Sequence, residues 1–196
     1  MENEEDETDT MNEKIVKIYT DGACSGNQND ENTGGWGAVL EYGTSAREIY
    51  GGESNTTNNR MEMKALISAF EALSREGLSI QVFCDSSYLM ECFRKKWYEK
   101  WLVNGWLTAK KDPVENRDLW EKLLPFLSRH DISFFRVKGH INIDYQTEAN
   151  IKKHFEKFRE WNGAEFTFEE FIHVTEMNNL ADKLANIGIR ETLESS

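Results

Sequence analysis

The stretch IVKIYTDGACSGN, residues 15–27, indicates how the chain folds. Its first half carries β-branched and aromatic side chains, which suit a buried strand. We expect this strand to end abruptly at Thr20-Asp21-Gly22, with a turn at Gly26-Asn27. A carboxylate at the end of a buried strand is costly unless it is paired or binds a cation. Asp21 therefore either opens a turn or belongs to a charged site.

Three further acidic residues stand at comparable places. A second apolar run, Ser79–Cys84, is followed by Asp85, a helical segment between the two strands carries Glu62, and a late helical segment carries Asp182. Parallel strands of an open sheet end at one edge, where ligands bind. Two bare carboxylates about 4 Å apart repel each other by roughly 4 kcal/mol at an effective dielectric near 20. Acids that converge in this way need a divalent cation, and oxygen ligands suit magnesium or manganese.

The composition is that of a globular chain with an uneven charge. Its 196 residues are 39% hydrophobic, enough for one domain with a core. No apolar run reaches membrane-spanning length, and no signal peptide is visible. The odd number of cysteines (Cys24, Cys84 and Cys92), without metal-binding spacing, favours a reducing, cytoplasmic setting.

The net charge of −12 is unusual for a nucleic-acid binder, but it is concentrated in two segments. Residues 1–13 hold seven acids and no Lys or Arg, and residues 141–177 hold eight acids against four bases. The remaining body is close to neutral. We expect residues 1–13 to form a disordered acidic tail and residues 14–196 to form one domain.

Hydrophobic patterns predict an α/β domain with a mixed five-stranded sheet. The expected strands are residues 15–20, 34–40, 46–50, 79–84 and 132–137, the first three forming an antiparallel meander. The expected helices are residues 60–76, 86–96, 116–129 and 147–161, then one opened by a capping box at Thr167–Glu170 and a final one capped by Asn178. Three tryptophans between residues 97 and 111 either join the core or form a surface for nucleic-acid stacking.

Seven motifs occur in the order found in type I ribonuclease H. They are YTDGACSGN, GGWGAVL, TTNNRMEMKAL, CDSSYLMECF, the Trp-rich run with NRDLWEKL, VKGH and NNLADKLA, covering about residues 14–140 and 178–190. The chain therefore resembles bacterial-like type I ribonuclease H, which implies the ribonuclease H-like fold. The resemblance also implies an endoribonuclease that cuts the RNA strand of RNA–DNA hybrids and leaves 5′-phosphate and 3′-hydroxyl ends.

The same resemblance implies two magnesium ions, replaceable by manganese, held by four carboxylates. By motif these are Asp21, Glu62, Asp85 and Asp182, the residues that the charge argument selects. One ion would activate a water and the other would stabilise the leaving oxygen. His140, in VKGH, matches a loop histidine associated with proton transfer or product release.

Substrate contacts are implied by motif at seven further positions. Reading a hybrid requires contact with 2′-hydroxyls on one strand and deoxyribose on the other. The matching residues are Asn27, Asn58 and Asn59 in the minor groove, Cys24 as a further contact, Thr57 at a phosphate, and Trp97 along the DNA strand. Lys100 replaces an asparagine that is common in the phosphate pocket, but as a point charge it can still meet a phosphate. The first four can equally be turn and capping residues, and Trp97 can be a core residue.

Besides Lys100, the chain departs from the family pattern in two places. Leu102-Val103-Asn104 stands where a basic cluster is common, so we expect weaker, less salt-dependent binding. In addition, 41 residues separate His140 from Asp182, which leaves Asp144 and Glu148 as alternative ligands. No N-terminal hybrid-binding domain is evident.

We expect the insertion, residues 141–177, to be a helical hairpin beside the catalytic edge. Its aromatic face (Phe155, Phe158, Trp161) would pack on Phe166, Phe168, Phe171 and Ile172. Its net charge of −4 argues against contact with the hybrid backbone. Positioning of the last helix, gating, a protein partner and an inert elaboration all stay open.

Two other functions also stay open. A non-catalytic hybrid-binding module would be favoured by a lost carboxylate, but all four are present. A retroelement-type ribonuclease H domain or a DNA-cutting relative is disfavoured by the TTNN segment. We expect a monomer whose partner is the RNA–DNA hybrid and not a membrane.

Overall fold

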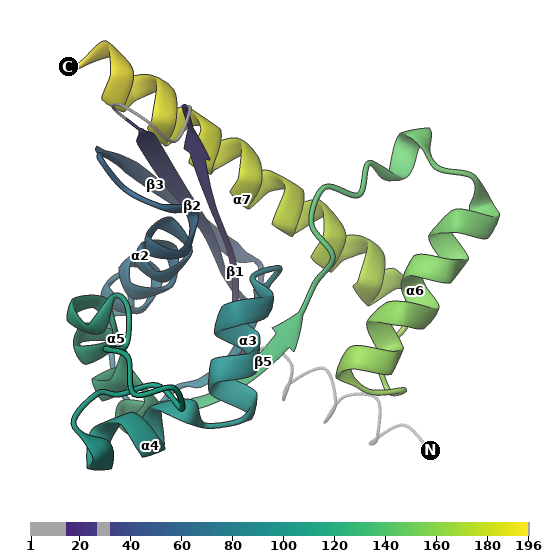
Figure 1. Cartoon of the computed structure of the whole chain (residues 1–196). Helices are drawn as coiled ribbons and strands as arrows, with labels where there is room; N and C mark the ends of the chain where they lie inside the picture. Colours follow the sequence, from purple (N-terminus) through teal and green to yellow (C-terminus); the bar gives the residue numbers. More distant parts are fainter. Residues whose placement is uncertain (1–14, 27–31, 196) are drawn as a thin grey trace.

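The computed structural model describes residues 15–26 and 32–195 and is built around one mixed sheet (Figure 1). Its strands are β1 (Ile15–Ser25), β2 (Thr33–Tyr42), β3 (Ser45–Ser54), β4 (Ser79–Cys84) and β5 (Asp131–Arg136), in the order β3-β2-β1-β4-β5. The first three pair antiparallel, and β4 and β5 add in parallel. The predicted sheet is confirmed, whereas the acidic tail and Asn27 lie outside the described residues.

β1 is longer than its apolar pattern predicts. Its pairing with β4 ends at Thr20 opposite Cys84, but its pairing with β2 continues to Ser25 opposite Thr33. The expected end of the strand at residues 20–22 is therefore wrong. Backbone hydrogen bonds to β2 do not depend on side-chain type, so they extend the strand beyond its apolar part. Asp21 still lies one residue past the point where β1 and β4 separate.

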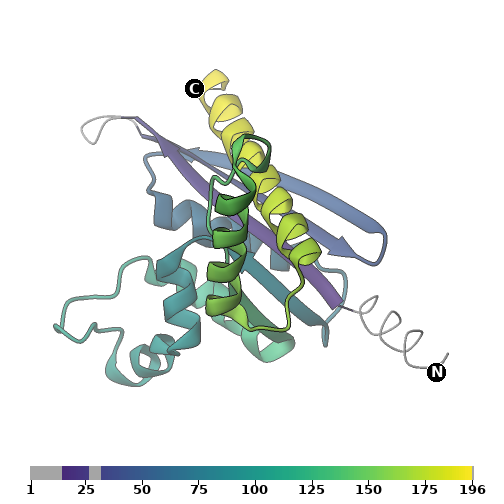
Figure 2. The same cartoon turned by 90° about the vertical axis from the view of Figure 1, so that its right-hand side faces the viewer.

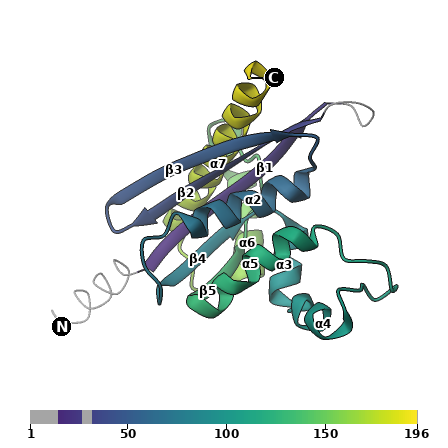
Figure 3. The same ribbon diagram turned by 90° about the vertical axis from the view of Figure 1, so that its left-hand side faces the viewer.

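One face of the sheet is covered by α2 (Asn58–Glu71), α3 (Ser87–Arg94) and α5 (Arg117–Arg129), with α4 (Trp97–Asn104) following α3 (Figure 3). α2 begins where Thr57 accepts a hydrogen bond from the Arg60 amide, and it packs Leu66 and Phe70 against Ile18. α4 has no counterpart among the expected helices. Two of the three tryptophans in that run, Trp101 and Trp106, are buried in this first core.

The opposite face is covered by α6 (Glu148–Asn162) and α7 (Phe168–Glu194), which follow the short η1 turn (Ile143–Tyr145) (Figure 2). The predicted capping box is confirmed, since Thr167 and Glu170 exchange both hydrogen bonds. Phe158, Phe166 and Phe171 form a second core with Tyr19 and Phe83 of the sheet. The expected aromatic hairpin is therefore present.

Two details of that hairpin differ from expectation. Trp161 does not join its aromatic mates, because its ring lies 4.3 Å from the Arg136 guanidinium. Asn178 does not cap a separate helix, because α7 runs through it without a break and buries its side chain. Positions 171, 174, 178, 181 and 185 fall on one buried stripe at helical spacing, which is apolar except at Asn178, so a single helix buries both predicted segments.

Among the residues that the structure describes, none of the helices combines the length and the apolar character needed to span a bilayer.

Candidate active site

Asp21 and Asp85 stand at the carboxyl ends of two parallel strands. The register pairs Thr20 of β1 with Cys84 of β4, so the next residue on each chain is one of these aspartates. Asp21 is buried, at 4% exposure, and accepts a hydrogen bond of 2.8 Å from the Gly22 amide. The sheet register therefore brings together the first pair of predicted site residues.

α2 brings Glu62 to the same place because Gly22 has no side chain. A Cβ on Gly22 would overlap the backbone of Met61 and Glu62, so only glycine lets the helix approach β1 this closely. Glu62 is also buried, and it accepts a hydrogen bond of 3.6 Å from the Cys84 thiol. One ligand atom each of Glu62, Cys84 and Asp85 lie within 4.8 Å of one another.

α7 supplies Asp182, again through a glycine. Gly37 is the strand partner of Asp21, and a Cβ there would overlap the Ala181 carbonyl oxygen. The helix therefore lies directly on β2 at this point, which sets Asp182 against Asp21. Asn186, one turn later, donates to the Asp182 carboxylate at 3.2 Å and to its carbonyl at 2.8 Å.

The two alternatives to Asp182 lie in exposed positions. Asp144 is in η1 and Glu148 is in the first turn of α6. Of these three acids, Asp182 is the one whose charge acts on both Asp21 and Asp85. The geometry thus favours Asp182 as the fourth member of the cluster, to which we refer below as the carboxylate cluster: Asp21, Glu62, Asp85 and Asp182.

Burial and mutual repulsion raise the pKa of the inner carboxyls. Desolvation, followed by the charges of Asp85 and Asp182, raises the pKa of Asp21 to about 8. Desolvation and then the charges of Asp85 and Asp21 hold the pKa of Glu62 well above its usual range. Desolvation raises the pKa of Asp85, against the charge of His140.

The carboxylate cluster is short of positive charge. No Lys or Arg of the described residues forms an ion pair with any of its four members. Buried oxygen ligands that repel one another and have no Lys or Arg partner are the donor set that a hard divalent cation satisfies. The residues present therefore fit such a cation.

His140 lies beside the carboxylate cluster on the loop after β5. Its side chain is 74% exposed, and its Nδ1 is 3.9 Å from Oδ1 of Asp182. The preceding residue, Gly139, approaches Asp85 so closely that a Cβ would overlap the Asp85 carboxylate. His140 itself has a positive φ of 56°, which directs the chain away from the sheet toward η1.

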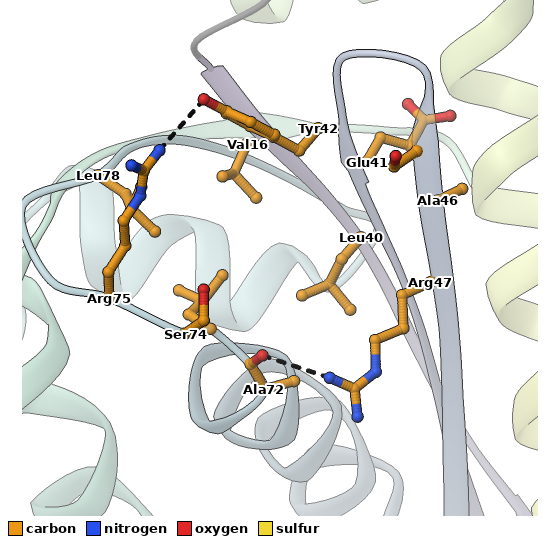
Figure 4. A pocket seen from close by; sticks show the side chains of 12 residues that line it. Val16, Leu40, Glu41, Tyr42, Ala46, Arg47, Ala72, Ser74, Arg75 and Leu78 are labelled. Atoms are coloured by element: carbon orange, nitrogen blue, oxygen red, sulfur yellow. Dashed lines mark hydrogen bonds between the residues drawn. The ribbon is translucent and has the colours of Figure 1, made fainter.

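Two hollows differ in their distance from this cluster. One, of about 440 Å³, is lined by His140, Asp182, Asn179 and Lys183. The other, of about 470 Å³, is lined by Val16, Leu40 and the side chains shown in Figure 4. Val16 precedes Asp21 by five residues of one strand, which is roughly 17 Å. The second hollow is therefore separate from the carboxylates.

The predicted substrate contacts fall into two groups. Thr57, Asn58 and Asn59 are exposed at the start of α2, one turn before Glu62, and Cys24 is partly buried on β1. Trp97 and Lys100 lie instead on α4, beyond the eight-residue α3 that follows Asp85, a helix about 12 Å long. Trp97 is partly buried, with the Lys95 ammonium 5.5 Å from its ring centre, and Lys100 is exposed.

Sequence reasoning missed two neighbours of the carboxylates. Cys84 could have been predicted from the sequence, because it directly precedes Asp85. Its side chain points to the opposite face of β4, which is the face that α2 covers. Asn186 stands four residues after Asp182, the spacing of helix neighbours.

Known proteins agree with this architecture. The family model for RNase H matches residues 13–152. A ribonuclease H of Caldanaerobacter subterraneus subsp. tengcongensis is 47% identical over 152 residues, covering 74% of this chain and 97% of that protein. One of Moorella thermoacetica is 52% identical over 127 residues, covering 65% and 81%.

Solved structures give the same answer for the fold. LC9-RNase H1, a type 1 RNase H with the type 2 active-site motif, has a TM-score of 0.66 and 24% identity, over 91% of this chain and 74% of that one. The RNase H domain of PFV has a TM-score of 0.58 and 25% identity, over 89% and 94%. On the family model and these bacterial relatives, the chain belongs to the ribonuclease H family.

Proposed function

We propose that this chain hydrolyses the RNA strand of RNA–DNA hybrids at the carboxylate cluster. The observation that carries this proposal is the convergence of four acids from β1, α2, β4 and α7, three of which have raised pKa values. Family membership supports the same reaction. LC11-RNase H1, a structural neighbour with a TM-score of 0.54 and 18% identity, has been solved with an RNA/DNA hybrid.

The cations we propose are two Mg²⁺ ions, with Mn²⁺ as a substitute, because the carboxylate ligands are hard oxygen donors. Bound there, such ions would supply an activated water and charge stabilisation at the leaving 3′-oxygen. The protein contributes the ligands, and Asp21 and Glu62 must release any proton they hold before they can act as ligands. The products we expect carry 5′-phosphate and 3′-hydroxyl ends.

His140 is the proposed proton carrier. Its ring is exposed to solvent, and its Nδ1 lies 3.9 Å from Oδ1 of Asp182, beside the place where the scissile phosphate would bind. We also propose that the residues at the start of α2 bind substrate, since the free amides and dipole of a helix N-terminus attract phosphate. Trp97 and Lys100 would extend that contact along α4. All of these residues belong to one proposed domain, residues 14–196, with an insertion at about residues 141–177.

The test is gel analysis of a labelled hybrid, an RNA duplex and a DNA duplex, each with Mg²⁺, Mn²⁺ or EDTA. We expect cleavage of the hybrid RNA strand alone, lost in EDTA and lost in Asp85→Asn with an unchanged circular dichroism spectrum. Hybrid cleavage at the wild-type rate by folded Asp85→Asn would refute the assignment of the carboxylate cluster. Cleavage of the DNA duplex would favour a DNA-cutting relative instead.

A further inference from the structure

The negative charge of the insertion conceals a separation of charge between its two helices. All four bases of residues 141–177 lie on α6: Lys152, Lys153, Lys157 and Arg159. The part of α7 that belongs to the insertion carries Glu169, Glu170 and Glu176 and no Lys or Arg. A net charge of −4 therefore says little about what α6 can bind.

α6 and the loop after β5 enclose a hollow of about 680 Å³, which we name the α6 groove. Its lining includes three lysines, a histidine and a tryptophan: Lys138, Lys153, Lys157, His154 and Trp161. Two acids, Glu156 and Glu160, also line it, and Lys157 pairs with Glu160 at 2.9 Å. Trp161 is flanked by cations, with Lys157 5.6 Å and Arg136 4.3 Å from the ring centre.

Lys138 and Lys153 supply positive charge without a counter-charge. Neither has a carboxylate within 4.0 Å among the residues that the structure describes. Burial, followed by the charges of Lys138 and Lys153, lowers the pKa of the His154 ring that both face. Two unpaired ammonium groups around one hollow are stabilised by an anionic ligand.

The α6 groove adjoins the carboxylate cluster. Lys138 directly precedes Gly139, whose Cα lies against the Asp85 carboxylate. α2 packs on one face of the sheet and α6 on the other, and Figure 1 draws these two helices on opposite sides of the sheet. A duplex laid over the cluster from the start of α2 therefore meets α6 as it continues past Asp85.

We propose that the α6 groove binds the phosphate backbone of the RNA–DNA hybrid, with Lys138 and Lys153 as the phosphate ligands. This inference rests on the proposed function and extends the substrate-binding surface to the side of the carboxylate cluster away from α2. Trp161 holds Arg136 and Lys157 at the foot of the groove. The insertion is then a substrate-binding element as well as a structural one.

A matched pair of charge reversals tests this. Lys153 lines the α6 groove, whereas its neighbour Lys152 is exposed on the same helix outside it. Lys153→Glu and Lys152→Glu change the net charge equally, so long-range repulsion is the same in both. Binding of a labelled long hybrid is measured by fluorescence anisotropy over a range of salt, in an Asp85→Asn background that prevents cleavage.

We expect Lys153→Glu to weaken binding roughly tenfold and to make the slope of log K against log salt shallower by about 1. Lys152→Glu should weaken it less than about twofold. Lys153→Gln, which removes the charge without reversing it, should fall between wild type and Lys153→Glu. Shortening the hybrid on the α6 side of the scissile position should abolish the difference between the two reversals, because the backbone no longer reaches the groove.

Equal weakening by the two reversals, with equal melting temperatures, would overturn the α6 groove as a phosphate site. A difference that persists on hybrids shortened on the α6 side would also overturn it. Neither result touches hydrolysis, which is measured separately with the wild-type chain. Conversely, a wild-type chain that cleaves no hybrid contradicts the proposed function, while the binding comparison still reports on the groove.

Discussion

Asp21 contributes to the pH dependence of the metal-free protein, because burial raises its pKa to about 8. An unfolded aspartate titrates near pH 3.9. Between these values the folded chain keeps a proton that the unfolded chain has released, so the free energy of unfolding falls as pH rises. The fall levels off above the folded pKa.

We therefore expect the melting temperature in EDTA to decrease from about pH 5 to pH 8. Asp21→Asn should be the more stable protein at pH 8 and should show a flatter profile, because its amide cannot ionise. Mg²⁺ should stabilise the wild type most at high pH, where the ligands are ionised. Identical profiles for wild type and Asp21→Asn would mean that Asp21 is already ionised when no cation is bound.

His140 invites a substitution that separates its ring from its backbone. Because its φ is 56°, alanine loses the imidazole and also strains the turn, whereas asparagine tolerates this conformation. We expect His140→Ala and His140→Asn to slow turnover alike, by roughly 10² or more, since general acid–base help is lost in both. The pH–rate profile should lose one limb in each variant, and metal-dependent cleavage should stay detectable. Full activity of His140→Asn would assign the residue a conformational role.

Sequence alone was sufficient to select Asp21, Glu62 and Asp85. Asp21 and Asp85 each directly follow an apolar run, and Glu62 lies in the first turns of a helical segment; these patterns are local. The roles of Gly22 and Gly139 were out of reach, because they depend on which backbone crosses each glycine. Which segment lies against each glycine depends on the strand order and on where the helices pack. Both are set by contacts between residues that are far apart in the sequence.

α7 is fixed on the sheet by glycines, and this fixes Asp182. Gly37 and Gly35 lie under the backbone of α7 at Ala181 and Ala185. A methyl group at Gly37 must push the helix outward, and overpacking of this kind typically costs about 1–3 kcal/mol. The helix would be displaced at Ala181, the residue that precedes Asp182, so the Asp182 carboxylate would move as well.

Gly37→Ala should therefore lower both stability and hybrid cleavage. We expect the loss of kcat to exceed what the unfolded fraction explains, measured well below the melting temperature. Ala38→Gly, the neighbouring change in the opposite sense, is the control, because it loosens the other face of β2 without displacing α7. A Gly37→Ala protein that is less stable but fully active would show that Asp182 tolerates a shift of the helix.

The boundaries of elements were predicted least well where tertiary contacts override local signals. Asn178 has the chemistry of a helix cap, yet it is buried inside α7. The preceding residues continue the same apolar stripe, so burying Phe171 and Val174 outweighs any advantage of a cap. The aromatic partners of Phe158, by contrast, were predicted correctly. The two helices of the hairpin are joined by one short loop, so few other aromatic side chains are within reach of Phe158.

The sheet has a core on each face, and the insertion completes the second one. Without α6 and the first turns of α7, Tyr19, Phe83 and Val137 would lose the aromatic side chains that cover them. Replacing residues 143–176 by a short Gly-containing loop would remove that cover and also shorten α7 by nine residues. We expect such a variant to melt far below the wild type, and that result would rule out an inert elaboration.

A point substitution reports on the same core without removing any charge. Phe158 is 2% exposed, and its ring centre lies 5.1 Å from that of Phe166 and 5.6 Å from that of Phe171. Phe158→Ala should lower the free energy of unfolding by about 3–5 kcal/mol, the usual cost of truncating a buried phenylalanine. Denaturant unfolding with an unchanged m-value measures this directly.

Cleavage kinetics of Phe158→Ala then show whether the hairpin only covers the second core or also positions the active site. Asn179 of α7 donates to the Ile141 carbonyl at 2.7 Å, which ties the helix to the loop carrying His140 without involving Phe158. We therefore expect kcat to stay within about twofold of wild type below the melting temperature, since truncated core residues act mainly on stability. Phe168→Ala, on the same hairpin but 48% exposed, should change neither quantity appreciably. A large loss of kcat in folded Phe158→Ala would instead make the hairpin a positioning element for Asp182, because a loosened second core would then be felt at the far end of the same helix.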